Sequence, residues 1–355
     1  MSYKILAINP GSTSTKISLY EDEKEIFTKK LDHPLEEIEK FDNVEGQLTM
    51  RKDFVIAFLK EINFDIEELS AVVARGGMLP PVKTGAYIIN ELMVDRVENR
   101  PIMEHASNLA APIAYGIAKE VGIPSYIYDC VMADELPDIA RISGMPDIAR
   151  TSSSHVLNTR AMAIKAAKMQ NKNYEDMNII VAHLGGGISI NVHEKGRIID
   201  LVSDDEGPFS PERAGRVPCR DLINLCYSGK FDKKTMQRKL RGNGGLRAYL
   251  NTIDAREVQE MIENGNQEAK LVYEAMAYQI AKSIGELSTV LEGNIDVIIL
   301  TGGIAHSKML TDWIVKRVKF IAPVEILAGE NEMEALSLGV LRVLRGEECA
   351  REYTE

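Results

Sequence analysis

The chain has 355 residues, of which 45% are hydrophobic and 27% charged, and a net charge of −11. This composition is sufficient for a large core and excludes wholesale disorder, and the length predicts two domains. The negative charge argues against nucleic acid and anionic membranes as partners, and the lack of an eighteen-residue apolar run excludes a transmembrane helix.

Short apolar runs bounded by turn residues predict strands in the first part of the chain, and helical spacing of apolar residues predicts helices. The predicted strands are 3–9, 15–20, 26–31, 71–74 and 126–128, and the predicted helices are 48–62 and 104–121. The short apolar stretch at the N-terminus is read as the first strand, because it is too short for a signal peptide.

The second part of the chain repeats this alternation of strands and helices. The predicted strands are 178–183, 188–193, 197–203 and 295–300, and the predicted helices are 155–169, 268–291 and 332–344. A break at 144–154, rich in Gly, Pro, Ser and Thr, marks the domain boundary. We therefore expect an N-terminal domain of residues 1–150 plus the C-terminal helix 333–355, and a nucleotide-binding domain of residues 151–332.

Four cysteines occur without any Cys-x-x-Cys pair. With no secretion signal, we expect reduced thiols and a cytoplasmic protein. No His pair has the spacing of metal ligands, so a structural zinc site is not expected.

An internal repeat is the most informative feature. The run Ile5–Thr13 has a counterpart in Ile180–Gly187: an apolar strand ends on a polar side chain, passes a short turn and continues into another strand. Chance similarity of two apolar strands is the alternative. A true repeat predicts two similar α/β domains with their turns directed into one cleft.

The turns at 11–14, 185–187 and 302–303 contain Gly, Ser and Thr and follow apolar strands. Without large side chains, successive backbone N–H groups can approach an anion and bind it. An acidic protein can hold a polyphosphate in this way, although the P-loop pattern is absent.

Four segments together carry a family resemblance: residues 8–16, 183–189, 206–213 and 301–304. They resemble the acetate and butyrate kinase family, within the superfamily of acetokinases, sugar kinases, heat-shock chaperones and actin. The resemblance covers the whole chain and implies an α/β fold of two similar actin-like (ribonuclease H-like) domains around a nucleotide cleft. The short chain, the Arg75–Pro80 segment and the triple glycine at 185–187 are most similar to the butyrate kinase branch.

The resemblance implies transfer of the ATP γ-phosphoryl group to a short-chain fatty acid, butyrate or a branched relative, with ATP/ADP and Mg²⁺. A carboxylate is already ionised at neutral pH and needs no general base, so catalysis is expected to rest on positioning and charge neutralisation. We expect a short-chain carboxylic acid and nucleotide as partners, and a homo-oligomer.

Two arginines are implied as catalytic, since a guanidinium binds carboxylate or phosphate bidentately. Arg75 ends a buried strand, where the alternative is an ordinary surface arginine. Arg213 lies in a Gly/Pro-rich loop, where Arg216 and Arg220 could be confused with it.

Asp129 and His155 complete the implied catalytic set. Asp129 is expected to orient an arginine or the hydrated metal, and its alternative role is a helix N-cap. His155 matches a family histidine that donates to the phosphoryl group. The alternative for His155, as for His183 at the second glycine turn, is a structural histidine.

The remaining implied sites bind nucleotide, metal and acyl chain. Phosphate and nucleotide contacts are expected from Asn9, Gly11, Ser12, Ser14, His183, Gly185, Gly186, Gly187, Gly302 and Gly303. Asn9 and Glu332 are expected to hold Mg²⁺ through water, although Glu332 could instead be an ordinary first-turn acid of a helix. Met78, Leu79 and Pro80 are expected to line an acyl pocket, and core packing is their alternative.

Two other functions fit parts of the sequence. A sugar kinase would use Asp129 as the base for a hydroxyl acceptor. An ATP-switched module of the chaperone or actin kind would need no acceptor.

Overall fold

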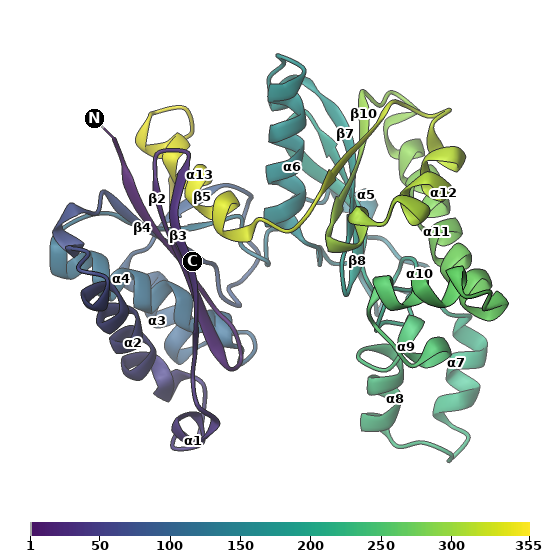
Figure 1. Cartoon of the computed structure of the whole chain (residues 1–355), viewed down its shortest axis with the longest axis horizontal. Coiled ribbons are helices and arrows are strands. Elements are labelled where there is room, and N and C mark those ends of the chain that lie inside the picture. The colour runs from purple at the N-terminus through teal and green to yellow at the C-terminus, as the bar shows by residue number, and fades with distance from the viewer. Residues whose placement is uncertain (1) are drawn as a thin grey trace. The chain divides into compact units, whose positions relative to one another are not determined.

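The computed structural model describes residues 2–355 (Figure 1). The chain forms two compact units, one of residues Met1–Asp134 with Asn331–Glu355 and one of residues Glu135–Glu330. The chain therefore leaves the first unit, builds the second and returns to the first.

The first unit is built on a seven-stranded sheet in the order β12-β5-β6-β4-β1-β2-β3. Its strands are β1 (Lys4–Pro10), β2 (Ser14–Glu21), β3 (Lys24–Asp32), β4 (Ala71–Arg75), β5 (Ala86–Ile88), β6 (Ser125–Tyr128) and β12 (Arg351–Glu352). The strands β1, β2 and β3 form an antiparallel meander, whereas β4 is parallel to both β1 and β6. The carboxyl ends of β1, β4 and β6 consequently lie along one edge of the sheet.

Helices cover both faces of this sheet. They are α1 (Leu35–Ile38), α2 (Leu48–Glu61), α3 (Glu91–Asn99), α4 (Ala110–Val121) and α13 (Glu332–Leu344). The main core contains side chains of α2, α3 and α4 together with β1, β2 and β4. The returning helix α13 packs against β1, β4 and β6.

The second unit is built on a five-stranded sheet in the order β11-β10-β7-β8-β9. Its strands are β7 (Asn178–Leu184), β8 (Ile188–Glu194), β9 (Arg197–Val202), β10 (Val297–Gly302) and β11 (Val324–Ala328). Again the first three strands form an antiparallel meander, and β10 is parallel to β7 and β11. The order β3-β2-β1-β4-β6 thus recurs as β9-β8-β7-β10-β11, which confirms the predicted internal repeat.

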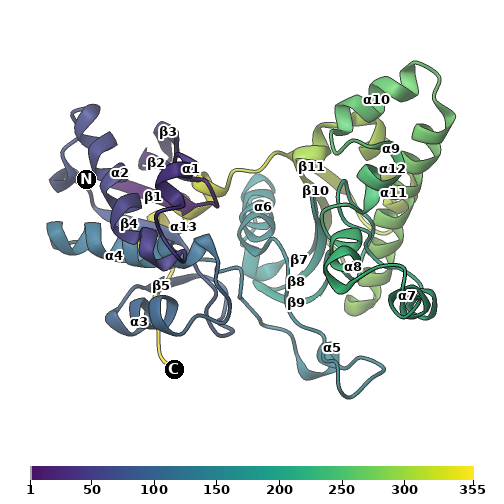
Figure 2. The same ribbon diagram turned by 90° about the horizontal axis from the view of Figure 1, so that it is seen from below.

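Figure 2 shows the second sheet between α6 on one side and α11 and α12 on the other. The helices of this unit are α5 (Asp138–Arg141), α6 (Val156–Met169), α7 (Cys219–Cys226), α8 (Lys233–Leu240), α9 (Gly245–Leu250), α10 (Ala255–Glu263), α11 (Gln267–Ser288) and α12 (Lys308–Val318). Alternate residues of β7 divide between the two faces: Ile180 and Ala182 join the core with α11 and α12, while Ile179 and Val181 pack with α6. Period-two alternation in a fully buried strand produces this division.

The boundary between the units differs from the predicted one at residue 150. The segment 135–150 belongs to the second unit, because Leu136 and Ala140 pack on Leu201 and the Arg150 guanidinium pairs with Asp200 at 3.0 Å. The Gly/Pro signal at 144–147 marks a loop of the second unit. At the other end the chain returns at Asn331, two residues before the predicted position of 333.

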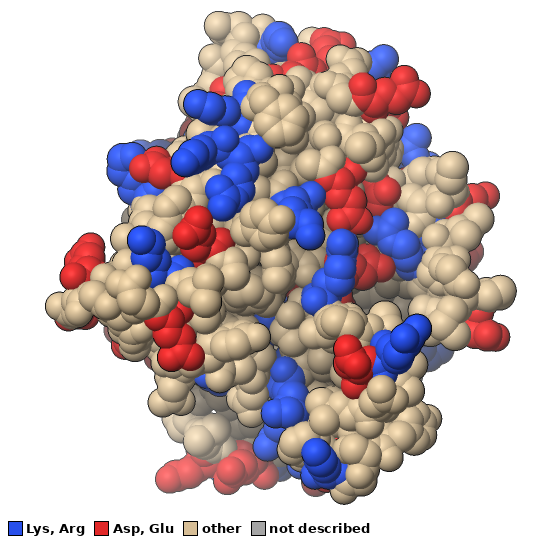
Figure 3. All heavy atoms as spheres, turned by 90° about the vertical axis from the view of Figure 1, so that its right-hand side faces the viewer, with Lys and Arg blue, Asp and Glu red and all other residues tan. Residues whose placement is uncertain are grey.

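Figure 3 shows one face of the molecule, with acidic and basic side chains interspersed among uncharged ones. Within residues 2–355 no helix is long and apolar enough to cross a bilayer. The four cysteines are free thiols, with Cys130 buried and the other three exposed.

Candidate active site

Three predicted site residues lie at the carboxyl edge of the first sheet. Asn9 is near the end of β1, Arg75 is the last residue of β4, and Asp129 directly follows β6. The register joins them, because Ile8 pairs with Ala74 and Arg75 pairs with Tyr128. Residues separated by more than fifty positions are thus placed on adjacent parallel strands.

Glu332, the first residue of α13, links two of these side chains. Its carboxylate accepts a hydrogen bond from Arg75 Nη1 at 2.6 Å and one from Asn9 Nδ2 at 2.8 Å. The Arg75 and Glu332 side chains are both partly exposed, at 28% and 31%. Glu332 is a first-turn acid of a helix and also belongs to the edge cluster. Its role in holding Mg²⁺ stays a prediction.

Asp129 is buried and has a positive φ of 43°. Its Oδ1 accepts a hydrogen bond from the Gly85 N–H at 2.7 Å. No described helix begins there, since the next one, α5, starts at Asp138. The alternative role as a helix N-cap is therefore wrong, and the left-handed backbone marks a position held by its surroundings.

The turn between β1 and β2 contains Gly11, Ser12 and Ser14. Gly11 N–H donates to Ser14 O at 2.7 Å, which closes the turn. The guanidinium of Arg51, on α2, donates to Gly11 O at 2.6 Å and to Ser12 O at 2.8 Å. Arg51 was missed by the sequence analysis, although its spacing from Val55 and Leu59 places a charge on the buried face of this helix.

The three predicted acyl-pocket residues differ in exposure. Leu79 is completely buried in the core of the first unit, whereas Met78 and Pro80 are partly exposed. Asn108 Oδ1 accepts a hydrogen bond from Met78 N–H at 2.8 Å and fixes this segment. In this structure Leu79 has the packing role that was its alternative.

The second sheet carries the glycine turns at the corresponding edge. His183 is near the end of β7 and pairs with Thr301, and Gly302 is the last residue of β10. Gly302 has φ 89°, and a Cβ there would overlap the backbone of Leu184. Only glycine fits at this position, because both its backbone conformation and its close neighbour exclude a side chain.

Two predicted histidines stack on one another. The ring centroids of His155 and His183 are 3.9 Å apart with an interplanar angle of 14°. Asn158 Oδ1 lies 2.9 Å from His183 Nδ1, and Ser189 Oγ lies 2.8 Å from His155 Nδ1. His183 Nδ1 is thus engaged by Asn158, and Nε2 lies beside the glycine turn.

His183 Nε2 is 3.2 Å from Glu330 Oε1. A Cβ on Gly185 would lie 2.9 Å from this nitrogen and 2.8 Å from the Glu330 oxygen. Glycine at 185 is therefore required for the histidine and the carboxylate to approach the turn. Asn158, Ser189 and Glu330 were not found from the sequence, because they contact the histidines only through the tertiary fold.

Arg213 lies against the same glycine turn. A Cβ on Gly187 would overlap its guanidinium. Arg213 also forms an ion pair with the buried Asp204, which pairs with Arg241 at 3.0 Å. Burial, with a smaller contribution from the Arg241 charge, lowers the Arg213 pKa to about 10, so the guanidinium stays charged at neutral pH. The structure thus brings Arg213 and Gly187 together and adds Asp204, which the sequence analysis missed.

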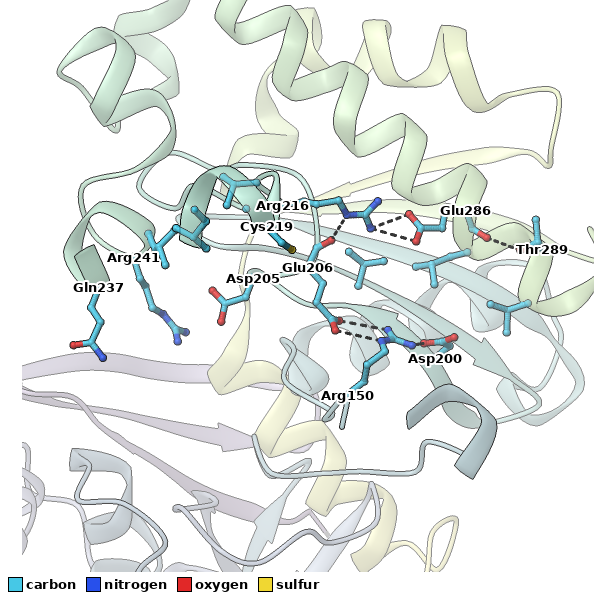
Figure 4. A pocket seen from close by; sticks show the side chains of 17 residues that line it. Arg150, Asp200, Asp205, Glu206, Arg216, Cys219, Gln237, Arg241, Glu286 and Thr289 are labelled. Atoms are coloured by element: carbon cyan, nitrogen blue, oxygen red, sulfur yellow. Dashed lines mark hydrogen bonds and ion pairs between the residues drawn. The ribbon is translucent and has the colours of Figure 1, made fainter. Parts of the chain in front are cut away.

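A separate cavity of about 920 Å³ lies in the second unit (Figure 4). Its three arginines are paired: Arg150 with Asp200 and Glu206, Arg216 with Glu286, and Arg241 with Asp204. None of the predicted site residues lines it. Arg216 pairs with Glu286 on the surface of this cavity, whereas Arg213 lies at the glycine turn. The structure thus distinguishes the two arginines that could be confused in the sequence.

Two other histidines have structural surroundings. His33 is buried with Nε2 at 2.8 Å from Thr15 Oγ1, and His193 is buried with Nδ1 at 2.7 Å from the Tyr174 hydroxyl. Among residues 2–355 no group of three or more His, Cys, Asp or Glu side chains could hold a metal ion. A metal with mostly water ligands is compatible with this result, and the Asn9 and Glu332 oxygens have the hard-donor chemistry that Mg²⁺ prefers.

Two solved structures with a similar fold are an acetate kinase and a propionate kinase. Acetate kinase from Porphyromonas gingivalis has a TM-score of 0.78 at 19% identity, covering 95% of this chain and 99% of that one. A propionate kinase from Francisella tularensis has a TM-score of 0.73 at 17% identity, covering 95% of this chain and 98% of that one. The chain therefore has the two-unit, actin-like α/β fold.

The sequence comparisons identify the family. The Acetokinase family pattern matches residues 150–334. Butyrate kinase 1 of Clostridium acetobutylicum is 50% identical over 353 residues, covering 99% of both proteins. Butyrate kinase 2 of the same organism is 49% identical over 355 residues, covering 99% of this chain and all of that protein. The chain belongs to the acetokinase family.

Proposed function

We propose that the chain is an ATP-dependent carboxylate kinase that phosphorylates a short-chain fatty acid, butyrate or a branched relative, reversibly at its carboxylate. The observation that carries this proposal is the identity of about half of all residues to butyrate kinases over the full length. The arrangement of charged groups at the two sheet edges supports it.

Arg75 and Arg213 are the cations of the proposed reaction. A carboxylate attacking a phosphoryl group brings negative charges together, so cations that neutralise them lower the barrier. Arg75 is partly exposed and held by Glu332, and Arg213 is held by Asp204 against Gly187. In both cases an acid fixes the guanidinium while donors remain for a ligand.

The histidine pair would serve the phosphoryl group and the nucleotide. His155 donates to the transferring phosphoryl group, and His183 contacts the nucleotide phosphates through Nε2, beside Gly185. Each of the turns at 11–14, 185–187 and 302–303 is proposed to contribute backbone N–H groups to phosphate binding.

Asp129 is proposed as an orienting group and not as a base. The acceptor carboxylate has no proton to remove, and the Asp129 Oδ1 is already engaged by the Gly85 N–H. A carboxyl group fixed at the end of β6 suits the orientation of a cation on the neighbouring strand.

Asn9 and Glu332 would hold Mg²⁺ through water. Their side chains are in contact at 2.8 Å and both offer oxygen. When bound, the ion neutralises charge on the nucleotide phosphates. Met78 and Pro80 are proposed to contact the acyl chain, with Leu79 packed behind them.

The proposal includes a cytoplasmic location and a homo-oligomer. The subunit number is measured by sedimentation equilibrium. The cytoplasmic location is tested by fractionation of cells that express the full chain.

Hydroxylamine trapping tests the proposed reaction. With Mg-ATP and butyrate, an acyl phosphate forms and hydroxylamine converts it into a hydroxamate. A sugar kinase consumes ATP with a hydroxyl acceptor and yields no hydroxamate, and an ATP-switched module hydrolyses ATP without any acceptor. Absence of butyrate-dependent hydroxamate would contradict the proposal.

A further inference from the structure

Arg51 has unusual surroundings for an arginine. It is 1% exposed and lies on the buried face of α2. Its Nε and Nη2 donate to Gln47 Oε1 at 3.0 and 2.8 Å, and its remaining bonds go to backbone carbonyls of the β1–β2 turn. No ion pair of Arg51 with a carboxylate occurs among the described residues. The positive charge is therefore balanced by dipoles only.

These bonds direct the carbonyls of the turn to one side. Gly11 O, Ser12 O and Ser14 O accept from Arg51 at 2.6, 2.8 and 3.2 Å. The carbonyl of Thr13 accepts from the His33 N–H at 2.9 Å. All four carbonyl oxygens of the turn are thereby engaged within the first unit.

The donors of the turn remain available. Ser12 and Thr13 are exposed, and their backbone N–H groups make no hydrogen bond among residues 2–355. A turn with its carbonyls held and its N–H groups unpaired has the polarity of an anion-binding concavity. A carbonyl facing the ligand would instead repel an anion.

The charge of Arg51 adds to this polarity. Burial lowers the Arg51 pKa, but a guanidinium remains protonated at neutral pH. Burial and the Arg51 charge lower the pKa of the neighbouring His33 to about 4, so His33 is neutral there. A single buried cation thus lies behind the turn, where low polarizability leaves its field poorly screened.

We propose that Arg51 is the positioning residue that makes the Gly11–Ser14 turn a polyphosphate-binding site. The inference rests on the proposed function, because the anion is taken to be the phosphate chain of ATP. Arg51 acts through the turn backbone and by its charge, and it does not itself contact the ligand.

The test compares Arg51→Gln and Arg51→Lys with the control Lys52→Gln. Lys52 is the next residue of the same helix and pairs with Glu120 at 2.6 Å on the surface, so the control removes a charge without touching the turn. The readouts are KM for ATP, KM for butyrate, kcat and the melting temperature of each full-length variant. Isothermal titration with Mg-ADP gives nucleotide affinity independently of turnover.

We expect Arg51→Gln to raise KM for ATP and Kd for Mg-ADP by about tenfold to a hundredfold, with KM for butyrate unchanged. Arg51→Lys keeps the charge with fewer donors and should fall between the wild type and Arg51→Gln. The control should match the wild type. An unchanged Kd for Mg-ADP in Arg51→Gln would overturn the inference, as would an equal loss in both KM values.

A second measurement uses the wild-type protein, so it tests the inference even if the Arg51→Gln variant does not fold. In the wild-type protein, hydrogen exchange at the Ser12 and Thr13 amides should be fast and should slow on addition of Mg-ADP. Exchange that does not respond to the nucleotide would contradict the inference. Loss of all hydroxamate formation in the wild type would instead contradict the proposed function, so the two failures are distinguishable.

Discussion

The first and second units have the same strand order but present different chemistry at the same edge. In the first unit the turn after β1 has Ser and Thr side chains and is held from behind by Arg51. In the second unit the turn after β7 has three glycines, with Ser210 Oγ donating to Gly186 O at 2.6 Å and Arg213 lying against Gly187. The common topology fixes where each turn lies, and contacts from outside the repeat decide which polar groups it presents.

We expect the largest effect on kcat when an arginine is removed from the carboxyl edge of either sheet. Arg75→Ala and Arg213→Ala should each lower kcat by about 10²-fold or more, because each removes charge stabilisation at the reacting groups. The rate of hydroxamate formation at saturating ATP and butyrate gives kcat for each variant.

Arg216→Ala is the matched control for these variants. Its guanidinium pairs with Glu286 on the surface of the separate cavity, so kcat should remain near that of the wild type. A large loss in Arg216→Ala with normal turnover in Arg213→Ala would exchange the roles of these two residues.

The two turns should differ in their tolerance of a methyl group. Gly187→Ala places a Cβ in the Arg213 guanidinium, and displacing that group should lower kcat by about tenfold to a hundredfold. Gly11→Ala places a Cβ 3.6 Å from its nearest neighbour, Ser14 O, and should leave kcat almost unchanged. Equal effects in steady-state assays of both variants would remove the distinction between the turns.

The end of β10 gives a smaller effect, on stability. Gly302 combines φ 89° with a close approach to Leu184, so Gly302→Ala should lower the free energy of unfolding by about 1–3 kcal/mol. Gly303→Ala is the control, because no atom lies within 4 Å of its Cβ position. Denaturant titration measures both, and equal stability of the two variants would contradict this interpretation of the strand end.

The last prediction of this comparison concerns the pH dependence of stability. Burial, with a smaller contribution from the Arg160 charge, lowers the His193 pKa to about 3, below its ordinary value of 6.5. The unfolded chain therefore binds the proton first, and stability is fully present above about pH 6.5 and is lost as the pH falls towards 3. His193→Asn should reduce the dependence of unfolding free energy on pH in that window by about one proton. An unchanged slope in denaturant titrations would show that His193 is not the group responsible.

Much of the fold follows from local sequence patterns. The strands of both meanders could be predicted from short apolar runs bounded by turn residues. The helices α2, α6 and α13 could be predicted because each spans 13 or 14 residues, long enough for a pattern of apolar residues to be read. The strands β5 and β12 could not, since three- and two-residue strands exist only through pairing with distant partners. Helices α7 to α10 were missed because none is longer than nine residues, which is shorter than the window in which a helical period is read from sequence.

The candidate site was predictable in part for a similar reason. Asn9, Arg75 and His183 lie at strand ends that the apolar runs mark, so the edge could be expected from the sequence. The residues that fix them, Arg51, Asp204 and Asn158, lie far along the chain and touch the site only after folding. Sequence patterns report local periods and motifs, whereas these contacts depend on tertiary packing.

The measurement that tests the central claim most directly is kcat/KM with Mg-ATP for acetate, propionate, butyrate, isobutyrate and hexanoate. Each buried methylene contributes about 0.8 kcal/mol, roughly a fourfold gain. Butyrate should therefore exceed acetate by about fifteenfold if Met78 and Pro80 contact the chain. Isobutyrate should be accepted, because methionine adapts to branched shapes, and hexanoate should fall below butyrate. Acetate as the best substrate would contradict the butyrate-type assignment, and no turnover with any acid would contradict the carboxylate kinase itself.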